Sequence, residues 1–241
     1  SNPAINDAIK KQVDNDLLFG YQYNTDIRVE FIEKLLEVSP SHFKKLVLLN
    51  SGSEATDAAY RLIKLWAKKN KKKYIITFEG NYHGRVLGSE LLGGTSDSTD
   101  WSNLKDDDIW FLPFPKDGDE LDINSLPPLN EIAAFFLETY QGWGSLFYPQ
   151  NYIDKLYQLS KENNILFCFD EVQSGFYRMG TLYGYMTYGD YEPDIITVGK
   201  GLTSSLPLSA VLSRTEIIDI DMKANLSSTH AGNAVCCAAG L

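Results

Sequence analysis

The sequence predicts an α/β fold in which a mainly parallel sheet is flanked by helices on both faces. Short, almost continuous apolar runs recur along the chain, and segments with helical periodicity lie between them. Apolar runs of this kind are typical of parallel strands that are buried on both faces. The expected strands are residues 47–49, 74–78, 133–137, 165–169 and 195–198.

The clearest helix is predicted over residues 53–69, between the first two expected strands. Its apolar side chains recur at helical spacing and therefore share one face; they are Ala55, Ala58, Ala59, Leu62, Ile63 and Trp66. A weaker pattern predicts a helix over 152–162. Residues 93–128 are rich in Asp, Ser, Gly and Pro, which predicts loops.

Composition excludes several classes of function. The net charge of −10 argues against a nucleic-acid partner, because phosphates require a basic surface. No apolar run reaches the roughly 18 residues of a membrane span, and no charged-then-apolar leader opens the sequence. The cysteines fit no zinc spacing and read as reduced thiols, so we expect a cytoplasmic location. The acidic runs 106–108 and 117–122 are interpreted as solvated loops, and no metal site is expected.

Several polar segments follow the expected strands, at the sheet edge where ligands bind in open α/β sheets. The first is the turn Ser51-Gly52-Ser53, which joins a strand to the 53–69 helix. Main-chain N–H groups and the positive end of a helix dipole suit a phosphate there, and the two hydroxyls add donors. An ordinary serine N-cap is the alternative interpretation.

Two further segments place polar and aromatic side chains at the same edge. Tyr82 and His83, bracketed by glycines, are expected to present their rings at the mouth of a pocket, although a half-buried surface position is the alternative. Asp170 directly follows an apolar strand, where burial is costly without a cationic partner. A helix N-cap or a surface loop is the alternative for Asp170.

Lys200 ends the last expected strand between two glycines, Gly199 and Gly201. We expect its ammonium group to lie in a partly dry site. Desolvation would lower its pKa and provide the neutral amine that a Schiff base needs. Most lysines are solvated surface residues, but few stand at the tip of a buried strand.

Together these segments resemble the class-III aminotransferases of the fold-type-I superfamily, which use pyridoxal 5′-phosphate (PLP). The matching motifs occur in the family's order along nearly the whole chain: Ser-Gly-Ser-Glu-Ala, Tyr-His-Gly-Arg, Asp-Glu-Val-Gln-Ser-Gly, Gly-Lys-Gly and Ser-Thr-His-Ala-Gly-Asn. Residues 2–9 look like the family's helix that leads into the large domain. The resemblance implies a three-layer PLP-binding large domain over residues 1–241. The ends look cut, so we expect an N-terminal segment and a C-terminal small domain to be missing and this piece to be inactive alone.

The resemblance also implies a role for individual residues. Lys200 would form the Schiff base with PLP and shuttle a proton, and Asp170 would pair with the pyridinium nitrogen. The other residues expected at the cofactor are Ser51, Gly52 and Ser53 at the phosphate, Tyr82 and Val172 on the two ring faces, Gln173 at the ring 3′-oxygen, and His83 and Glu138 beside the pocket. Thr229 would contact the cofactor phosphate of a neighbouring subunit, which implies a homodimer.

The resemblance predicts an enzyme that moves an amino group from a small-molecule amino donor to an oxo acceptor. Members acting on ornithine, acetylornithine or γ-aminobutyrate commonly carry Gln-Gly-Glu where this chain has Gln141-Gly142-Trp143. We therefore expect Trp143 to shape the substrate pocket for other donors. An aminomutase or decarboxylase on the same scaffold stays open, as does a non-catalytic module that binds a phosphate-bearing ligand.

Overall fold

A computed structural model describes residues 2–15, 20–21, 23–95, 101 and 103–241. Within these residues a seven-stranded sheet has the order β1-β9-β8-β7-β4-β2-β3. The strands of this sheet are β1 Lys45–Leu49, β2 Tyr74–Phe78, β3 Ile109–Leu112, β4 Ile132–Glu138, β7 Leu166–Asp170, β8 Ile195–Val198 and β9 Ser209–Ser213. A small separate hairpin pairs β5 Tyr140–Gln141 with β6 Leu146–Phe147.

Helices and short 3-10 turns connect these strands. The helices are α1 Pro3–Asp14, α2 Asp26–Val38, α3 Gly52–Asn70, α4 Leu87–Leu92, α5 Gln150–Glu162, α6 Thr215–Ile218 and α7 Ala234–Gly240. The 3-10 turns are Ile123–Ser125, Leu129–Glu131, Gly184–Thr187, Lys200–Leu202 and Met222–Ala224.

The prediction of a mainly parallel sheet is confirmed. Strands β3, β2, β4, β7 and β8 run parallel in that spatial order, whereas β9 is antiparallel to both β8 and β1. All of the strands expected from the sequence are present. Two strands of this sheet were not predicted: β9, and β3, which lies inside the 93–128 segment that the sequence predicts as loops; the hairpin strands β5 and β6 were not predicted either. Residues 96–100 and 102 of that segment are outside the described residues.

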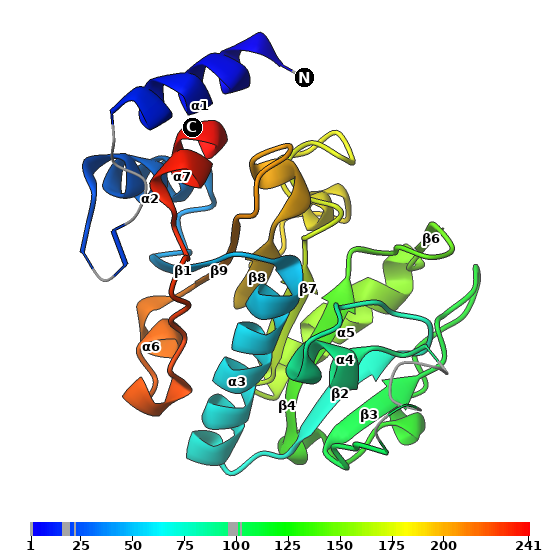
Figure 1. Cartoon of the computed structure of the whole chain (residues 1–241). Coiled ribbons are helices and arrows are strands. Elements are labelled where there is room, and N and C mark those ends of the chain that lie inside the picture. The colour runs from blue at the N-terminus through cyan, green and yellow to red at the C-terminus, as the bar shows by residue number, and fades with distance from the viewer. Residues whose placement is uncertain (1, 16–19, 22, 96–100, 102) are drawn as a thin grey trace.

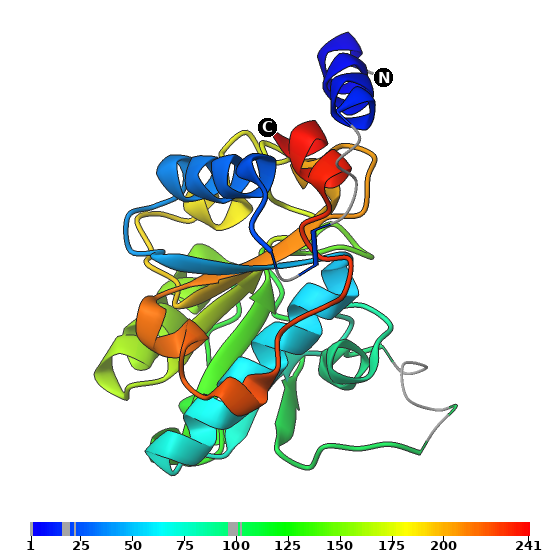
Figure 2. The same cartoon turned by 60° about the vertical axis from the view of Figure 1, so that its left-hand side comes forward.

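Helices cover both faces of the sheet, as Figures 1 and 2 show. On one face of the sheet, α3 and α6 pack on a hydrophobic core. Strand β4 contributes Ala134 and Phe136 to this core. On the opposite face, α2 and α5 enclose a second core to which β4 contributes Phe135 and Leu137. The period of two along a strand explains this division. The three-layer architecture is therefore confirmed.

Helix α3 begins at the carboxyl end of β1 because the sequence caps it there. The Ser51 hydroxyl accepts from the Glu54 N–H at 3.2 Å, and the Glu54 carboxylate accepts from the Ser51 N–H at 2.9 Å. This capping box satisfies donors that a helix start otherwise leaves without partners. The cap also places the first turn of α3 at the edge of the sheet where β7 and β8 end (Figure 1).

The two ends of the described chain lie side by side. Helix α1 projects from the body and packs against α7 (Figures 1 and 2). No helix among the described residues is both long enough and apolar enough to cross a membrane.

Candidate active site

A small cavity of about 160 Å³ opens at the carboxyl ends of β4, β7 and β8. Its walls come from five separate parts of the chain. The lining residues are Gly52, Ser53, Tyr82, His83, Gly84, Glu138, Tyr140, Asp170, Val172, Gln173, Ser174 and Lys200. Most of the residues expected at a cofactor from the sequence are thus brought together, and Gly84, Tyr140 and Ser174 join them.

Strand register explains why the polar residues converge. Glu138 on β4 pairs with Asp170 on β7, and Asp170 pairs in turn with Thr197 on β8. Residues in register on adjacent strands point to the same face, so these three form a row across the sheet edge. Lys200 lies three residues after Thr197, beyond the end of the strand. This row results from the pairing of β4, β7 and β8, and no single segment of the sequence predicts it.

Asp170 is buried, and its carboxylate is held on all sides. Oδ1 accepts from the Val172 N–H at 3.0 Å and from the Thr197 hydroxyl at 3.1 Å. Oδ2 lies 2.8 Å from His83 Nδ1 and 3.5 Å from the Thr56 hydroxyl. Sequence reasoning missed Thr197 and Thr56. The sequence signal for Thr197 was a threonine inside the apolar run 195–198, whereas Thr56, between Ala55 and Asp57, had no such signal.

His83 is not at the pocket mouth, which corrects the expectation from the sequence. The residue is only 3% exposed, and its ring meets Phe136 edge-on, with centroids 4.9 Å apart. The cause is the bond to Asp170, because a carboxylate accepts only and so draws the Nδ1–H inward. Nε2 is buried without a hydrogen-bond partner among the described residues. Tyr82, 36% exposed, does lie at the mouth.

The backbone at the start of α3 approaches the Asp170 loop very closely. A Cβ atom added to Gly52 would lie 2.6 Å from Val172 Cγ1, so only glycine allows this contact. Gly84 has φ +126°, and its added Cβ would lie 2.3 Å from Ser53 Oγ. The Ser53 hydroxyl accepts from the Arg85 N–H at 3.0 Å, which fixes the 82–85 segment over the helix start.

Glu171 shapes the turn that carries Val172 and Gln173. Its fully buried carboxylate accepts from the Ser174 hydroxyl at 2.8 Å, from the main-chain N–H groups of residues 184 and 185, and from the Thr139 hydroxyl. Burial raises the pKa of Glu171, and these donors oppose the shift. The two acidic residues at the end of β7 therefore have different roles: Asp170 lines the cavity, and Glu171 anchors the turn.

Glu138 supports the Tyr82 loop from below. Its carboxylate accepts from the Tyr82 N–H at 2.8 Å and from the Gly142 N–H at 3.1 Å. Burial raises the pKa of Glu138 to about 7. The electrostatic interaction with His83 and the two N–H groups act to lower it. Glu138 thus titrates near neutral pH inside the cavity wall.

This pKa predicts a pH dependence of stability. Because the pKa of Glu138 is about 7 in the folded chain and 4.5 when exposed, the folded state binds more protons between these values. The stability that Glu138 contributes is therefore complete below the lower value and lost as pH rises through the upper one. Between about pH 5 and pH 8, we expect the free energy of unfolding of the wild type to fall by about 2–3 kcal/mol relative to that of the Glu138→Gln variant.

Urea denaturation of both proteins across that pH range measures this difference. Titration of Glu171 and Asp194, whose pKa values are also raised by burial, cancels in the comparison. Parallel pH profiles for the two proteins would contradict the assignment to Glu138.

Lys200 begins a 3-10 turn directly after β8 and Gly199, with φ 36°. Its side chain is exposed and its Nζ donates to the Gln173 side-chain oxygen. The expectation of a partly dry site is therefore wrong for the described structure. The physical reason is that Lys200 stands past the strand end, where the cavity rim borders solvent.

Trp143 lies on the β5–β6 hairpin beside the cavity mouth. It is 69% exposed, and its ring meets Tyr82 edge-on with centroids 6.3 Å apart. On the other side, the Arg85 guanidinium lies 5.8 Å from the Tyr82 ring centre. These three side chains border a second hollow of about 370 Å³, which also contacts Glu138 and Gln173.

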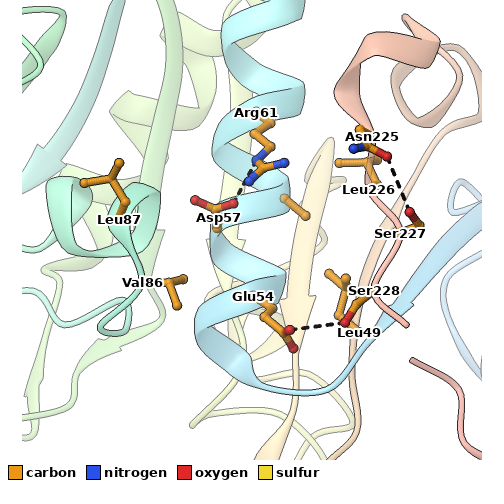
Figure 3. A pocket seen from close by; sticks show the side chains of 11 residues that line it. Leu49, Glu54, Asp57, Arg61, Val86, Leu87, Asn225, Leu226, Ser227 and Ser228 are labelled. Atoms are coloured by element: carbon orange, nitrogen blue, oxygen red, sulfur yellow. Dashed lines mark hydrogen bonds and ion pairs between the residues drawn. The ribbon is translucent and has the colours of Figure 1, made fainter. Parts of the chain in front are cut away.

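Two of the expected cofactor residues lie outside the cavity. Ser51 borders a neighbouring opening that Gly52 and Lys200 also border. Thr229 is exposed in a turn. It directly follows Ser228, which lines a different hollow of about 310 Å³, shown in Figure 3. That hollow is lined by Ser228 and by charged side chains of α3, and it contains none of the residues expected at the cofactor.

Comparison with known proteins decides the family. The sequence pattern of the family described as "Aminotransferase class-III" matches residues 1–241. The chain is a member of the class-III aminotransferase family. It is 34% identical over 235 residues to the isoleucine 2-epimerase of Lentilactobacillus buchneri, covering 88% of this chain and 51% of that protein. It is 32% identical over 246 residues to the acetylornithine aminotransferase of Aquifex aeolicus, covering 99% of this chain and 62% of that protein.

Solved structures agree with this family assignment. The ornithine aminotransferase of Toxoplasma gondii, described with partial occupancy of PLP at its active site, superposes with a TM-score of 0.86 and 25% identity. The match covers 99% of this chain and 57% of that one. The fold is therefore that of the fold-type-I PLP transaminases. The chain spans between about half and three-fifths of the length of these relatives.

The cofactor of class-III aminotransferases is PLP, and the cavity of this member fits it. The first turn of α3 has N–H groups without acceptors inside the helix, and only glycine at position 52 allows its backbone to meet Val172. A buried carboxylate, Asp170, lines the same cavity as an amine, Lys200. The first turn of a helix, a carboxylate and an amine are thus arranged around one small space.

Proposed function

We propose that the protein is an aminotransferase that moves an amino group between an amino acid or amine and a 2-oxo acid or aldehyde. The observation that carries the proposal is that Lys200 and Asp170, on adjacent strand ends, line one cavity beside the start of α3. When bound, PLP supplies an aldehyde that condenses with amines and a ring that accepts electron density from the substrate Cα–H bond. The remaining roles belong to the protein.

The start of α3 is proposed to hold the phosphate. Gly52 and Ser53 offer main-chain N–H groups at the positive end of the helix dipole, and Ser51 and Ser53 offer hydroxyls. Support comes from the capping box, which already holds this turn in a helix-start conformation. The free N–H groups need no rearrangement to meet an anion.

The ring is proposed to lie between Tyr82 and Val172, with Asp170 at its nitrogen and Gln173 at its 3′-oxygen. A carboxylate at a protonated ring nitrogen forms a charge-assisted hydrogen bond. The bonds from His83 and from the two threonines hold Asp170 in place, so it cannot rotate away as charge develops. His83 is a positioning residue in this proposal, and Glu138 positions the Tyr82 loop.

Lys200 is proposed to carry the cofactor and then to move the proton. Once a substrate amine displaces it, its neutral amine would take the proton from the substrate Cα and return it at the carbon on the other side of the nitrogen, the former aldehyde carbon of the cofactor. Its exposed position gives it the freedom to reach both atoms. Residues 1–241 are proposed to be the large, cofactor-binding domain of this enzyme.

We further propose that the enzyme is a cytoplasmic homodimer in which Thr229 contacts the phosphate of the neighbouring subunit. Support comes from the position of Thr229, which is exposed and does not line the cavity of its own chain. A hydroxyl in an exposed turn is available to another chain.

The substrate side of the cavity is proposed to be shaped by Trp143. An indole edge against Tyr82 replaces the carboxylate that ornithine-type and γ-aminobutyrate enzymes commonly carry at this position. Trp143 cannot pair with a guanidinium as a carboxylate does, and it offers an apolar surface to the donor side chain. We propose that the best donors are amines or amino acids other than ornithine, acetylornithine and γ-aminobutyrate.

A panel of amino donors with a labelled Cα hydrogen tests the proposed transamination and the proposed role of Trp143 in donor preference. Transamination produces an oxo acid and consumes the acceptor, whereas epimerisation, named for the Lentilactobacillus buchneri relative, inverts the donor without a net oxo product. We expect oxo-acid formation, with kcat/KM for apolar donors above that for ornithine. Trp143→Glu should lower kcat/KM for the best apolar donor about 10- to 100-fold. Ornithine as the best wild-type donor would refute the role of Trp143.

A further inference from the structure

Arg28 is a buried cation whose hydrogen-bond acceptors among the described residues are all main-chain carbonyls. It lies on α2 and is only 9% exposed. Nε donates to the Gly232 carbonyl at 3.0 Å, and Nη2 donates to the Ala231 carbonyl at 3.0 Å. Nη1 donates to the carbonyls of Tyr21 and Tyr23 at 2.7 and 3.1 Å. One guanidinium thus joins two segments that lie about 200 residues apart in the sequence.

The approach of the 231–232 segment to Arg28 depends on a glycine. Gly232 has φ +64°, and an added Cβ would lie 2.8 Å from Arg28 Nε and 2.8 Å from Leu48 Cδ1. A side chain at this position would therefore push the guanidinium away. The planar fork of arginine reaches several carbonyls at once, which the single ammonium of lysine does not.

The other end of the same segment has its own anchor. Ser228 accepts from the Asn50 side-chain amide at 2.7 Å and donates to the Glu54 carboxylate at 3.3 Å, the contact that Figure 3 marks. Burial acts to raise the pKa of Glu54, but the N–H groups of Ser51 and Asn50 outweigh it and hold the pKa below its usual value. The charged carboxylate thus serves both the cap of α3 and Ser228.

Thr229 stands between these two anchors. The Ala231 N–H donates to the Ser228 carbonyl at 3.0 Å, which closes a turn with Thr229 and His230 in its middle. The turn is thus held at both ends, and its Thr229 side chain is exposed between the two anchors. Without Arg28, the carbonyls of Ala231 and Gly232 would lose the guanidinium donors that hold this end of the turn.

We infer that Arg28 is a positioning residue for Thr229, and through it for the cofactor phosphate. The inference rests on the proposed contact of Thr229 with the phosphate of a neighbouring subunit. Arg28 touches neither cofactor nor substrate in its own chain; it sets where the 228–232 turn stands. Glu54 is less suitable for a test, because its replacement would also uncap the phosphate cradle.

The test compares PLP with pyridoxal, which lacks the phosphate. Dissociation constants of both are measured for the wild type, Thr229→Val, Arg28→Met and Lys72→Met. Lys72 is a matched control, because this half-buried cation also donates to two main-chain carbonyls, those of Ile132 and Asn163, at 2.9 Å and far from the turn. Sedimentation and melting temperature record assembly and stability for each variant.

We expect Thr229→Val and Arg28→Met each to weaken PLP binding about tenfold while pyridoxal binding changes less than about twofold. Lys72→Met should lower the melting temperature without changing the ratio of the two constants. If Arg28→Met does not fold, Arg28→Lys supplies the same comparison with a smaller ratio.

Each other outcome is decisive. If Thr229→Val shows the phosphate-specific loss and neither Arg28 variant does, the inference on Arg28 is wrong while the role of Thr229 stands. If Thr229→Val shows no such loss, the proposed role of Thr229 is wrong, and the inference fails with it. An equal loss for PLP and pyridoxal in an Arg28 variant assigns Arg28 to stability alone.

Discussion

Replacing Lys200 with alanine is expected to abolish the borohydride-stable bond between the protein and PLP and to reduce turnover by about 10⁴-fold or more. The reason is that Lys200 is the amine that lines the cavity, past the end of β8 and close to Asp170. Its loss would remove both the proposed covalent attachment and the proposed base for the substrate proton. The proposed phosphate site at the start of α3 does not depend on Lys200.

The variant is therefore expected to bind PLP non-covalently. After borohydride reduction, peptide mapping shows which lysine carries the label, and absorbance titration measures the remaining binding. Lys155→Ala is the control, because Lys155 is a half-buried lysine of α5 that donates to the Gln158 side chain and does not line the cavity. Labelling of another lysine in Lys200→Ala, with turnover retained, would overturn the assignment.

Asp170→Asn is expected to lower turnover about 100-fold while PLP binding falls much less. The amide keeps the shape of the side chain, and its oxygen can still accept from the Val172 N–H and the Thr197 hydroxyl. It loses the charge that would hold a proton on the ring nitrogen. The phosphate contacts are untouched, so most of the cofactor affinity remains.

The structure also predicts a loss of stability in this variant. An amide N–H₂ facing His83 Nδ1 forces the imidazole proton onto Nε2, which is buried without an acceptor among the described residues. An unsatisfied buried donor costs about 1–3 kcal/mol. Differential scanning calorimetry measures this cost separately from turnover.

Asp194→Asn is the matched control for Asp170→Asn. Asp194 is equally buried, at 6% exposed, and accepts from the Phe167 N–H at 2.8 Å at the opposite end of the same strands. Its replacement should reduce stability and leave turnover per folded molecule unchanged. Equal turnover losses in the two variants would show that Asp170 acts only through stability.

Much of the architecture could be predicted from the sequence alone. Apolar runs identify β2, β4, β7 and β8 to within about one residue, because strands buried on both faces must be apolar throughout. The face of α3 is also readable, since its alanines and leucines repeat at helical spacing. These signals are local, and local periodicity is what a sequence displays directly.

Strands with weak local signals were not predictable. β3 is a short edge strand in which Trp110 and Phe111 are partly exposed. The acidic loop residues around it make the segment look like a loop in the sequence. β9 contains serine at both ends and alanine inside, yet every residue of it is buried. Its neighbours β1 and β8 supply the burial, so tertiary contacts outweigh its weak propensity.

The sequence by itself determined which residue types stand at the strand ends: the serine-glycine turn, the acidic pair, and the lysine between glycines. Only the tertiary structure decided which other residues lie next to them. Strand register aligned Glu138, Asp170 and Thr197 in one row, and burial turned His83 inward onto Asp170. It also brought Arg28 to Gly232, 204 residues away along the chain. Such contacts depend on how separate elements pack, and no local pattern encodes that packing.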